Sequence, residues 1–420
     1  MTTPSPKHAY GKASQRRRDA MSSPAIWSPA TSSPASGRAA DSALIVGAGI
    51  GGLAAAIALR QAGLDVSVAE QAPALEDVGA GLQLTPNATR VLRTLGVLDA
   101  VEAVAIAPEA LEVIDGRTGR RIARCDYAPA VARHGAPFLV LHRADLHAVL
   151  ALAARTAGCR ILLDARIEGV ELGEHGATAI ASRAGEPLCL GADILVGADG
   201  VRSTVRALLG HASTPKFAAR LAYRATIPTL SDGPPVVRLH LGPDAHLVTY
   251  PVRGGTTTNV VAVVKENWPV ARWSAPGEAS NVHRTYAGWA DETRALLARA
   301  PEFKCWGLYD MDPLNRWGSG RATLLGDAAH AMLPFLAQGA AQAIEDAASL
   351  AQALTEHAHP DLALRAYETA RRPHTARIQR EARGNGTLYH LSGPAAFARD
   401  AVLRLTGSRL IDRYDWIYSA

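Results

Sequence analysis

Three glycines and one carboxylate near the start of the chain have the types and spacing that can hold a phosphate-containing ligand. Gly47, Gly49 and Gly52 form a G-x-G-x-x-G pattern between an apolar run and a helix-like run. Glycine lets the backbone turn tightly, and free N–H groups at a helix start attract an anionic pyrophosphate. Glu70 lies 23 residues after Gly47, where a carboxylate can accept hydrogen bonds from a ribose. The pattern predicts a dinucleotide site, without separating NAD from FAD; its alternative is a turn that serves packing only.

A second pattern lies near the other end of the chain, in the segment LGDAAHAMLPFLAQGAAQAIEDA at residues 325–347. Gly326 and Asp327 follow a short apolar run. Pro334 and Gly339 then bracket a loop before a helix-like run of small residues, among them Ala340. A strand that ends in a carboxylate and feeds such a helix is suited to a ribityl-phosphate cofactor. Two sites so far apart predict one long cofactor lying across the fold.

A third acidic position follows the apolar run 193–196. Asp199 lies in a G-A-D-G turn before a helix-like run that contains Arg202 and Arg206. A carboxylate at the carboxyl end of a parallel strand is well placed to contact a ligand. The alternative is a helix N-cap. The agreement with the other two sites favours the cofactor.

Composition excludes several classes of function. The net charge is +5, but residues 1–41 hold six Lys/Arg and two Asp, which leaves the rest near neutral and gives no reason to expect nucleic-acid binding. The four cysteines show no C-x-x-C spacing, so they are expected to be reduced in a cytoplasmic protein. Histidines, cysteines and carboxylates show no metal-ligand spacing, so no metal is expected. No apolar run is suited to span a membrane.

The first 41 residues are rich in Ser, Pro and Ala, with an arginine run at 16–18. This composition predicts a disordered tail. A targeting segment is the alternative, and Met21 is an alternative start.

The elements that must position these residues follow from periodicity. Residues 43–46, 53–62 and 66–70 predict a strand, a helix and a second strand, which is a complete βαβ unit. From about Phe217 the chain becomes rich in strands joined by Gly/Pro/Asp turns. We predict an α/β fold: a Rossmann-like dinucleotide-binding domain, an inserted antiparallel substrate domain and C-terminal helices. The predicted boundaries are 42–216 and 317–360 for the first, 217–316 for the second and 361–420 for the helices, after the tail 1–41.

From about Ala43 to the C-terminus these elements resemble the class A flavoprotein monooxygenases, the family of p-hydroxybenzoate hydroxylase. The likeness is closest to the branch of salicylate hydroxylase, 3-hydroxybenzoate 6-hydroxylase and 6-hydroxynicotinate 3-monooxygenase. The resemblance implies FAD as the cofactor and NADH or NADPH as co-substrate. It implies these cofactor-binding residues: Gly47, Gly49, Gly52, Glu70, Gln71, Arg143, Asp199, Gly326, Asp327, Gly339 and Ala340.

The substrate residues of the family are matched only in part. Tyr223 falls where relatives place an active-site tyrosine, whereas Ala219 and Gln83 stand where relatives have histidine. A histidine base at those positions is therefore not supported. Tyr223 would orient the substrate or relay a proton, or else pack as an aromatic residue of the sheet. Pro334 would flank the isoalloxazine ring, and His330 would lie near it or serve as a structural hydrogen-bonding group.

The implied reaction is hydroxylation of a small phenolic acid. FAD reduced by NAD(P)H reacts with O2 to give a C4a-hydroperoxide, while the protein excludes water and helps to ionise the phenol. One alternative is a monooxygenase of the same fold with a non-phenolic or natural-product substrate. Another is a non-catalytic FAD-binding redox sensor. The apolar C-terminal helices could also pair into a homodimer.

Overall fold

The computed structural model describes residues 25–27, 39–75, 80–211, 213–229, 233–267 and 274–419. Most of the predicted tail, residues 1–24 and 28–38, lies outside the described residues.

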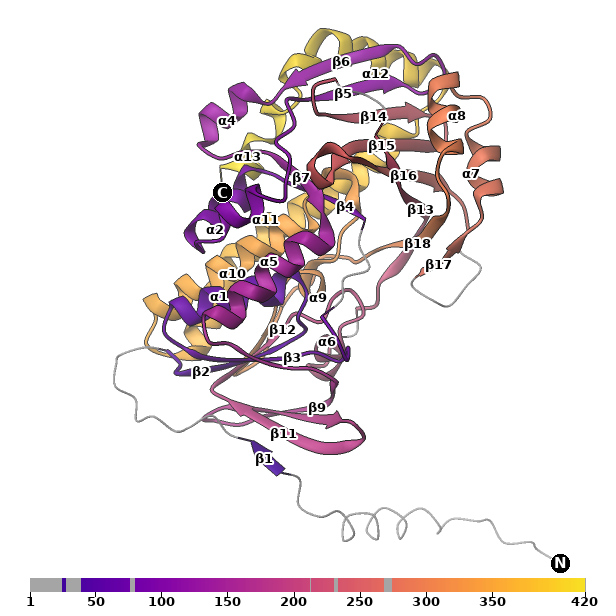
Figure 1. The fold of residues 1–420 in the computed structure, drawn as a ribbon. Coiled ribbons are helices and arrows are strands. Elements are labelled where there is room, and N and C mark those ends of the chain that lie inside the picture. Colours follow the sequence, from indigo (N-terminus) through magenta and orange to yellow (C-terminus); the bar gives the residue numbers. More distant parts are fainter. Residues whose placement is uncertain are drawn as a thin grey trace, which may run out of the picture.

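A five-stranded parallel sheet forms the lower half of the molecule in Figure 1. Its strands are short runs of apolar residues, as expected for strands that are covered on both faces. All neighbouring strands are parallel, so their carboxyl ends meet at one edge. In spatial order they are β19 (Ala322–Leu324), β12 (Ile194–Gly197), β2 (Ser42–Val46), β3 (Asp65–Ala69) and β8 (Arg160–Leu162).

An eight-stranded mixed sheet forms the upper half (Figure 1). Because side chains alternate along each strand, the sheet has two different faces. The inner face carries Arg224, Trp306 and His246, and the outer face is covered by α7 (Ala279–Thr285) and α8 (Asp291–Ala298). The strands in spatial order are β17 (Ser274–Gly277), β18 (Phe303–Asp310), β13 (Lys216–Pro228), β16 (Thr257–Lys265), β15 (Ala245–Val252), β14 (Val236–Gly242), β5 (Ala110–Asp115) and β6 (Arg121–Asp126).

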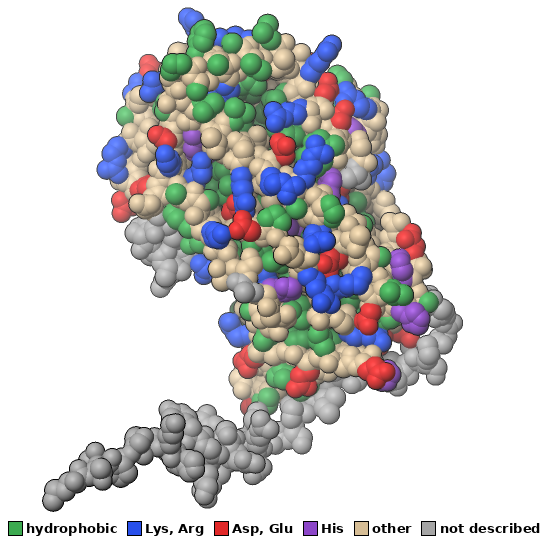
Figure 2. Space-filling model, turned by 180° about the vertical axis from the view of Figure 1, so that it is seen from behind, with side chains coloured by type: hydrophobic (Ala, Val, Ile, Leu, Met, Phe, Trp, Pro, Cys, Tyr) green, Lys and Arg blue, Asp and Glu red, His purple; other side chains and the backbone are tan. Residues whose placement is uncertain are grey.

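The C-terminal helices join the two halves. The 30-residue helix α11 (Pro360–Tyr389) runs between the two sheets, and α12 (Gly393–Thr406) packs against the inner face near β5 and β6 (Figure 1). Phe397, Val402 and Leu405 of α12 are exposed, and Figure 2 shows hydrophobic side chains gathered at the end of the molecule where this helix lies. The short helix α13 (Asp415–Tyr418) ends the described chain.

Smaller elements complete the fold. A four-stranded sheet covers the face of the parallel sheet opposite α1, and a two-stranded ribbon lies between the halves. The first holds β1 (Ala25–Trp27), β9 (Ala165–Leu172), β10 (Ala177–Arg183) and β11 (Glu186–Ala192), and the second β4 (Gly81–Leu84) and β7 (Leu139–His142). The short helices are α2 (Pro86–Thr94), α3 (Leu98–Glu102), α4 (Ala128–His134), α6 (Thr204–Leu208) and α9 (Asp327–His330), with 3-10 turns η1 (Arg253–Gly255), η2 (Pro334–Leu336), η3 (Gly407–Arg409) and η4 (Asp412–Tyr414).

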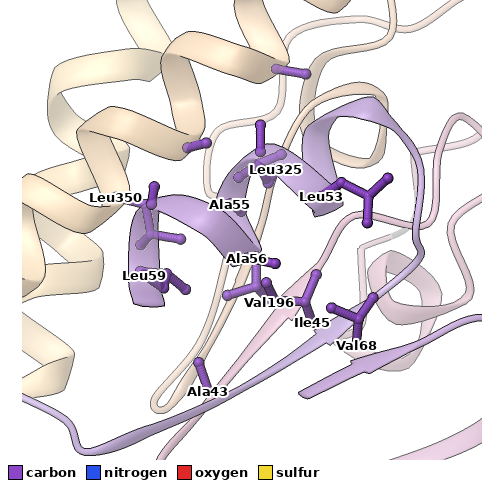
Figure 3. Close-up of a cluster of buried hydrophobic side chains, with 14 of the residues drawn as sticks. Ala43, Ile45, Leu53, Ala55, Ala56, Leu59, Val68, Val196, Leu325 and Leu350 are labelled. Atoms are coloured by element: carbon purple, nitrogen blue, oxygen red, sulfur yellow. The ribbon is translucent and has the colours of Figure 1, made fainter. Parts of the chain in front are cut away.

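The core of the lower half is a sandwich of the parallel sheet, α1 (Ile50–Gln61) and α10 (Gly339–Glu356) (Figure 3). The middle of α1 reads LAAAIAL, and its small residues let it pack closely between strands and helix. Ile45 and Val68 meet α1 from the sheet, and Leu350 meets it from α10. Helix α5 (Arg143–Thr156) packs beside α1. This packing fixes the N-termini of α1 and α10 at the carboxyl edge of the sheet.

The architecture confirms the predicted fold class, including the βαβ unit. The boundaries drawn at residues 217 and 316 stay a prediction. Strands β5 and β6, which precede residue 217, join the eight-stranded sheet because β5 pairs in parallel with β14. Within the described residues, no helix has the length and apolar character needed to cross a membrane.

Candidate active site

Two adjoining cavities lie between the parallel sheet, the inner face of the eight-stranded sheet and the C-terminal helices. The first has a volume of about 320 Å³ and extends from Gly49 to Trp306. The second, of about 730 Å³, is lined by apolar side chains of the inner face and by α11 and α12. Pro334 and Ala337 line both cavities, so the loop between β19 and α10 forms a wall that they share.

The glycine loop between β2 and α1 forms one end of the first cavity. Gly47 has a φ of +104°, and a Cβ there would lie 2.6 Å from the carbonyl oxygen of Ala198. A Cβ on Gly52 would lie 1.9 Å from the carbonyl oxygen of Gly47, so both positions require glycine. Around Gly49, in contrast, nothing lies within 4 Å of the position of a Cβ. The N-terminus of α1 is therefore open towards the cavity, as a pyrophosphate site requires.

Glu70 braces this loop from the end of β3. Its Oε2 accepts a hydrogen bond of 2.8 Å from the N–H of Ala48, and its Oε1 accepts one of 2.9 Å from the N–H of Ala72. The carboxylate therefore lies beside the glycine loop, where the ribose was predicted. Its contact with a ribose, and that of the exposed neighbour Gln71, stay predictions.

Arg143 lies on the opposite side of the same cavity. It is the first residue of α5, which follows β7, and its side chain is exposed and lines the cavity. The strand-to-helix turn thus presents a cation where the cofactor was predicted, and the contact itself stays a prediction.

Asp199 lies just outside the cavity lining, after β12. Its side chain accepts hydrogen bonds from the hydroxyl of Ser203 and, at 3.0 Å, from the N–H of Val205. It therefore shapes the start of α6, which is the capping role considered as the alternative. Its neighbours Ala198 and Gly200 do line the cavity, so this turn borders the cofactor site through its backbone.

The Gly-Asp turn forms the middle of the first cavity. Gly326 has a φ of +61°, and Asp327 begins α9 and lines the cavity. A Cβ on Gly339 would lie 3.9 Å from Oδ1 of Asp327, so the carboxylate lies close to the N-terminus of α10. The positive end of that helix would favour an anionic group by roughly 0.3–1 kcal/mol. Gly339 and Ala340 line the same cavity.

A buried ion cluster supports this turn from behind. Oδ2 of Asp346 accepts a 3.0 Å hydrogen bond from the N–H of Gly326 and lies 2.6 Å from Nε2 of His330. Its Oδ1 accepts a 2.7 Å hydrogen bond from Nε of Arg371. Burial raises the pKa of Asp346, but the charges and hydrogen bonds of His330 and Arg371 outweigh it and hold the pKa at about 2. His330 is thus a partner of Asp346 that lies outside the cavity lining, and a catalytic role for it stays a prediction.

The predicted substrate residues do not come together. Gln83 lies on β4 and lines the second cavity. Tyr223 lies on the outer face, where its hydroxyl donates a 3.3 Å hydrogen bond to Glu266 and its ring packs edge-on against Phe303. Ala219 is exposed at an irregularity of β13, where the backbone has a φ of +53°. The roles proposed for Ala219 and Tyr223 stay predictions, and neither residue lines the two cavities.

The sequence reasoning missed the residues of the inner face. Arg224 directly follows Tyr223 and lines the first cavity with Trp306, whose ring lies 5.5 Å from its guanidinium. His246 and Tyr389 line the second cavity. Alternation along β13 shows that Tyr223 and Arg224 face opposite ways, but nothing local shows which face meets the cofactor.

Among the described residues, no group of His, Cys, Asp and Glu could hold a metal ion. The first cavity suits FAD instead. One end of this cavity is formed by the glycine loop, where an added Cβ would clash at Gly47 and Gly52 and would occupy open space at Gly49. The middle of the cavity is formed by Asp327 and the start of α10.

Comparison with known proteins agrees with this geometry. The model of the FAD binding domain family matches residues 41–382. The chain is 36% identical to a 3-amino-4-hydroxybenzoate 2-monooxygenase, PtmB3, of Streptomyces platensis, over 89% of this chain and 94% of the relative. It is 34% identical to 3-hydroxybenzoate 6-hydroxylase 1 of Aquipseudomonas alcaligenes, over 89% and 96% of the two chains. The structure of Klebsiella pneumoniae HpxO complexed with FAD and uric acid superimposes with a TM-score of 0.79 at 26% identity, covering 88% of this chain and 95% of that one. The chain therefore belongs to the FAD-binding family of flavoprotein aromatic hydroxylases, as its sequence predicted.

Proposed function

We propose that this protein uses FAD, NADH or NADPH, and O2 to hydroxylate a small phenolic acid. The observation that carries the proposal is the shared wall at Pro334 and Ala337, which puts an apolar cavity next to the cofactor cavity. An aromatic ring in the second cavity would lie beside the isoalloxazine end of FAD, which Pro334 would flank. The similar proteins named for hydroxybenzoate substrates support this substrate class.

The residues of the chain have separate tasks in this reaction. FAD, when bound and reduced, supplies the activation of O2. The glycine loop, Asp327 and the start of α10 hold and orient it. Phe335 and Val248 make the second cavity apolar, which keeps water from the reacting ring. A few polar groups, Gln83 and Asn385 among them, lie in the same lining and can orient a substrate.

Substrate-stimulated oxidation of the nicotinamide cofactor tests the proposal. The yellow holoenzyme would be mixed with NADH or NADPH and a panel of hydroxybenzoates, while absorbance at 340 nm, hydroxylated product and H2O2 are measured. We expect at least one phenolic acid to accelerate oxidation and to yield product in near-stoichiometric amount. Purified protein without flavin would refute the proposal. Flavin-containing protein that no phenol stimulates would fit a redox sensor instead.

The size of the second cavity favours a second candidate function, the hydroxylation of a larger aromatic substrate. Its volume of about 730 Å³ lies within the range of roughly 300–1,000 Å³ typical of pockets for drug-sized ligands. The side of this cavity formed by α12 carries Leu403 and Val402, which suit an apolar extension of the ring. Phenolic acids with and without an alkyl or acyl extension would decide between the two. A kcat/KM that rises with the extension favours the larger substrate.

A homodimer through α12 completes the proposal. Phe397, Val402 and Leu405 expose 72%, 57% and 85% of their surface, which is a costly arrangement for large apolar residues in water. Light scattering of the native protein and of Leu405→Ser would test it. We expect a dimer that the substitution weakens, and a monomeric native protein would refute this interface.

A further inference from the structure

Three arginines line the second cavity, and all of them lie on the side formed by α12 and the turns that follow it. Arg399 belongs to α12, Arg409 to η3 and Arg413 to η4. Among the described residues that line this cavity, none is Asp or Glu. Helix α12 lies at the end of the upper half opposite the parallel sheet (Figure 1). The cavity therefore has an apolar wall at Pro334, next to the cofactor site, and a cationic side at α12.

Arg399 is a fixed cation on that side. Its side chain is only 5% exposed, and its Nε donates a 2.8 Å hydrogen bond to Oδ1 of Asp400. Its Nη1 donates hydrogen bonds of 3.1 and 3.2 Å to the backbone carbonyls of Leu388 and Tyr389. These acceptors leave Nη2 without a partner among the described residues, so this nitrogen is free to bind a ligand. A buried guanidinium with a free N–H group favours an anionic acceptor.

The carboxylates near these arginines stay outside the lining of the cavity. Asp400 pairs with Arg399, and Glu381 of α11 lies 3.4 Å from Arg413. Arg409 is exposed and meets no carboxylate at ion-pair distance within the described part of the chain. An anion that enters the cavity thus meets positive charge and no like charge in the lining. Such complementarity selects an acid over a neutral molecule of the same shape.

Tyr389 connects the cationic side to the wall beside the cofactor site. Its backbone carbonyl accepts the hydrogen bond from Arg399, and its hydroxyl donates one of 3.0 Å to the backbone carbonyl of Phe335. Phe335 directly follows Pro334, which lines both cavities. Because Tyr389 itself lines the second cavity, a ligand of similar length lying along it would reach from Arg399 to the shared wall. That length corresponds to a phenol ring with about two carbon atoms before the carboxylate, as in tyrosine.

We propose that the second cavity takes a phenol whose carboxylate stands at the end of a short carbon chain, and that Arg399 binds this carboxylate. The inference rests on the proposed function, and it narrows the larger aromatic substrate to one that is anionic at the end remote from the flavin. In a hydroxybenzoate the carboxylate is attached directly to the ring. Here the chain would pass Val402 and Leu403, which line the cavity beside Arg399. Binding at the fixed guanidinium would hold the phenol ring against the wall at Pro334.

The test uses the holoenzyme and a series of acids with increasing chain length: hydroxybenzoate, hydroxyphenylacetate, hydroxyphenylpropanoate and hydroxyphenylbutanoate. Each acid would be paired with its neutral carboxamide. Dissociation constants would be measured from the change in flavin absorbance, and kcat and KM from product formation. The variants are Arg399→Gln, Arg399→Lys and Arg409→Gln. Arg380→Gln is the matched control, because Arg380 is an exposed arginine of α11 that lines neither cavity.

We expect the native protein to bind hydroxyphenylpropanoate most tightly and its carboxamide roughly 10- to 100-fold more weakly, as for the loss of a charge-assisted hydrogen bond. In Arg399→Gln this preference for the acid should fall below about threefold, mainly through KM. Arg399→Lys should recover part of it, and Arg409→Gln should reduce it most at low salt. Arg380→Gln should keep the native preference. A merely structural Arg399, acting only as a cap of α11, would weaken binding of the acid and the carboxamide equally.

A preference for the acid that Arg399→Gln leaves intact would overturn the inference, and so would tightest binding of hydroxybenzoate. Either result would leave the proposed function in place. If Arg399→Gln does not fold, the native protein and Arg409→Gln decide: equal binding of acid and carboxamide by the native protein would overturn the inference. A native holoenzyme whose NADH or NADPH oxidation no phenol stimulates would overturn both the inference and the proposed function.

Discussion

Replacing Asp346 with asparagine removes the charge at the centre of the buried cluster behind the Gly-Asp turn. The native carboxylate accepts hydrogen bonds from Gly326 and Arg371 and lies against His330. An asparagine of the same shape turns an NH2 group towards one of these donors and leaves the buried guanidinium of Arg371 without this carboxylate. Glu345 is then the remaining carboxylate within reach, at 3.1 Å.

The expected size of the effect follows from the pKa of Asp346. It is held at about 2 in the folded protein, against an ordinary value of 3.8. A difference of this size corresponds to about 2 kcal/mol of stability at neutral pH. Breaking a buried ion pair by removing one partner typically costs about 3–5 kcal/mol. We therefore expect Asp346→Asn to lower the free energy of unfolding by about 3 kcal/mol at pH 7.

The sign of the pH dependence is also fixed. The pKa of Asp346 is lowered on folding, so its contribution is complete above about pH 4 and is lost as the pH falls towards 2. The difference between the native protein and the variant should therefore narrow in acid.

Urea unfolding followed by circular dichroism would measure this difference, with and without added FAD. Asp126→Asn is a matched control, because Asp126 pairs with Arg124 at 2.8 Å but is 61% exposed, so its loss should cost less than about 1 kcal/mol. FAD should also bind more weakly to Asp346→Asn, since the N–H of Gly326 then faces either an NH2 group or an uncharged, weaker acceptor. A variant within 0.5 kcal/mol of the native protein at pH 7, or a difference independent of pH, would show that the ion cluster does not support the turn.

Three further substitutions test the site. Asp327→Ala should lower the flavin content of purified protein, read as absorbance near 450 nm per chain, and unchanged content would contradict the assignment of Asp327 as a cofactor-binding residue. Gly52→Ala places a methyl group 1.9 Å from a backbone oxygen and should give unfolded or flavin-free protein. Gly49→Ala, which has open space around the added methyl group, should fold normally and only weaken FAD binding. Equal behaviour of the two variants by circular dichroism would contradict the loop geometry. Tyr223→Phe should keep kcat within twofold and lose about 1 kcal/mol of stability with its hydrogen bond to Glu266, because the hydroxyl points away from both cavities. A large fall in coupled hydroxylation would instead restore Tyr223 as a proton relay.

The cofactor site could be located from sequence because its signals are local. Gly47 and Gly52 must be glycine because any side chain there would clash with the backbone of the same turn or of the residues after the neighbouring strand. Such a local constraint produces a fixed spacing of glycines that can be recognised in the sequence. Asp327 likewise follows an apolar run that predicts a strand, and Gly339 stands at the start of a run of small residues that predicts a helix. The capping contacts of Asp199 could be weighed as an alternative for the same reason, since Ser203 and Val205 lie within six residues of it.

The residues that line the second cavity could not be predicted in this way, because their positions depend on contacts between elements far apart in the sequence. Which face of β13 meets the cofactor is decided by helices α7 and α8, which cover Tyr223 from the outer side, and by α11, which lies on the inner side. His246 and Tyr389, which both line the second cavity, come from distant parts of the chain and share no motif. The resemblance assigns Tyr223 an active-site role from its position in the strand alone. The direction of its side chain, however, follows from the irregular register of β13 after Phe217.

The two cavities are coupled by more than their shared wall. Nε2 of Gln338, just before α10, donates a 2.8 Å hydrogen bond to the hydroxyl of Thr85, and Nδ2 of Asn87 donates one of 3.1 Å back to Oε1 of Gln338. Thr85 directly follows β4, the strand that carries Gln83 into the second cavity. Since all three polar side chains are buried, each lost partner leaves an unsatisfied group that costs about 1–3 kcal/mol. These hydrogen bonds therefore fix β4, which lines the second cavity, relative to the N-terminus of α10, which lines the first. A substrate that displaces β4 must also disturb the N-terminus of α10.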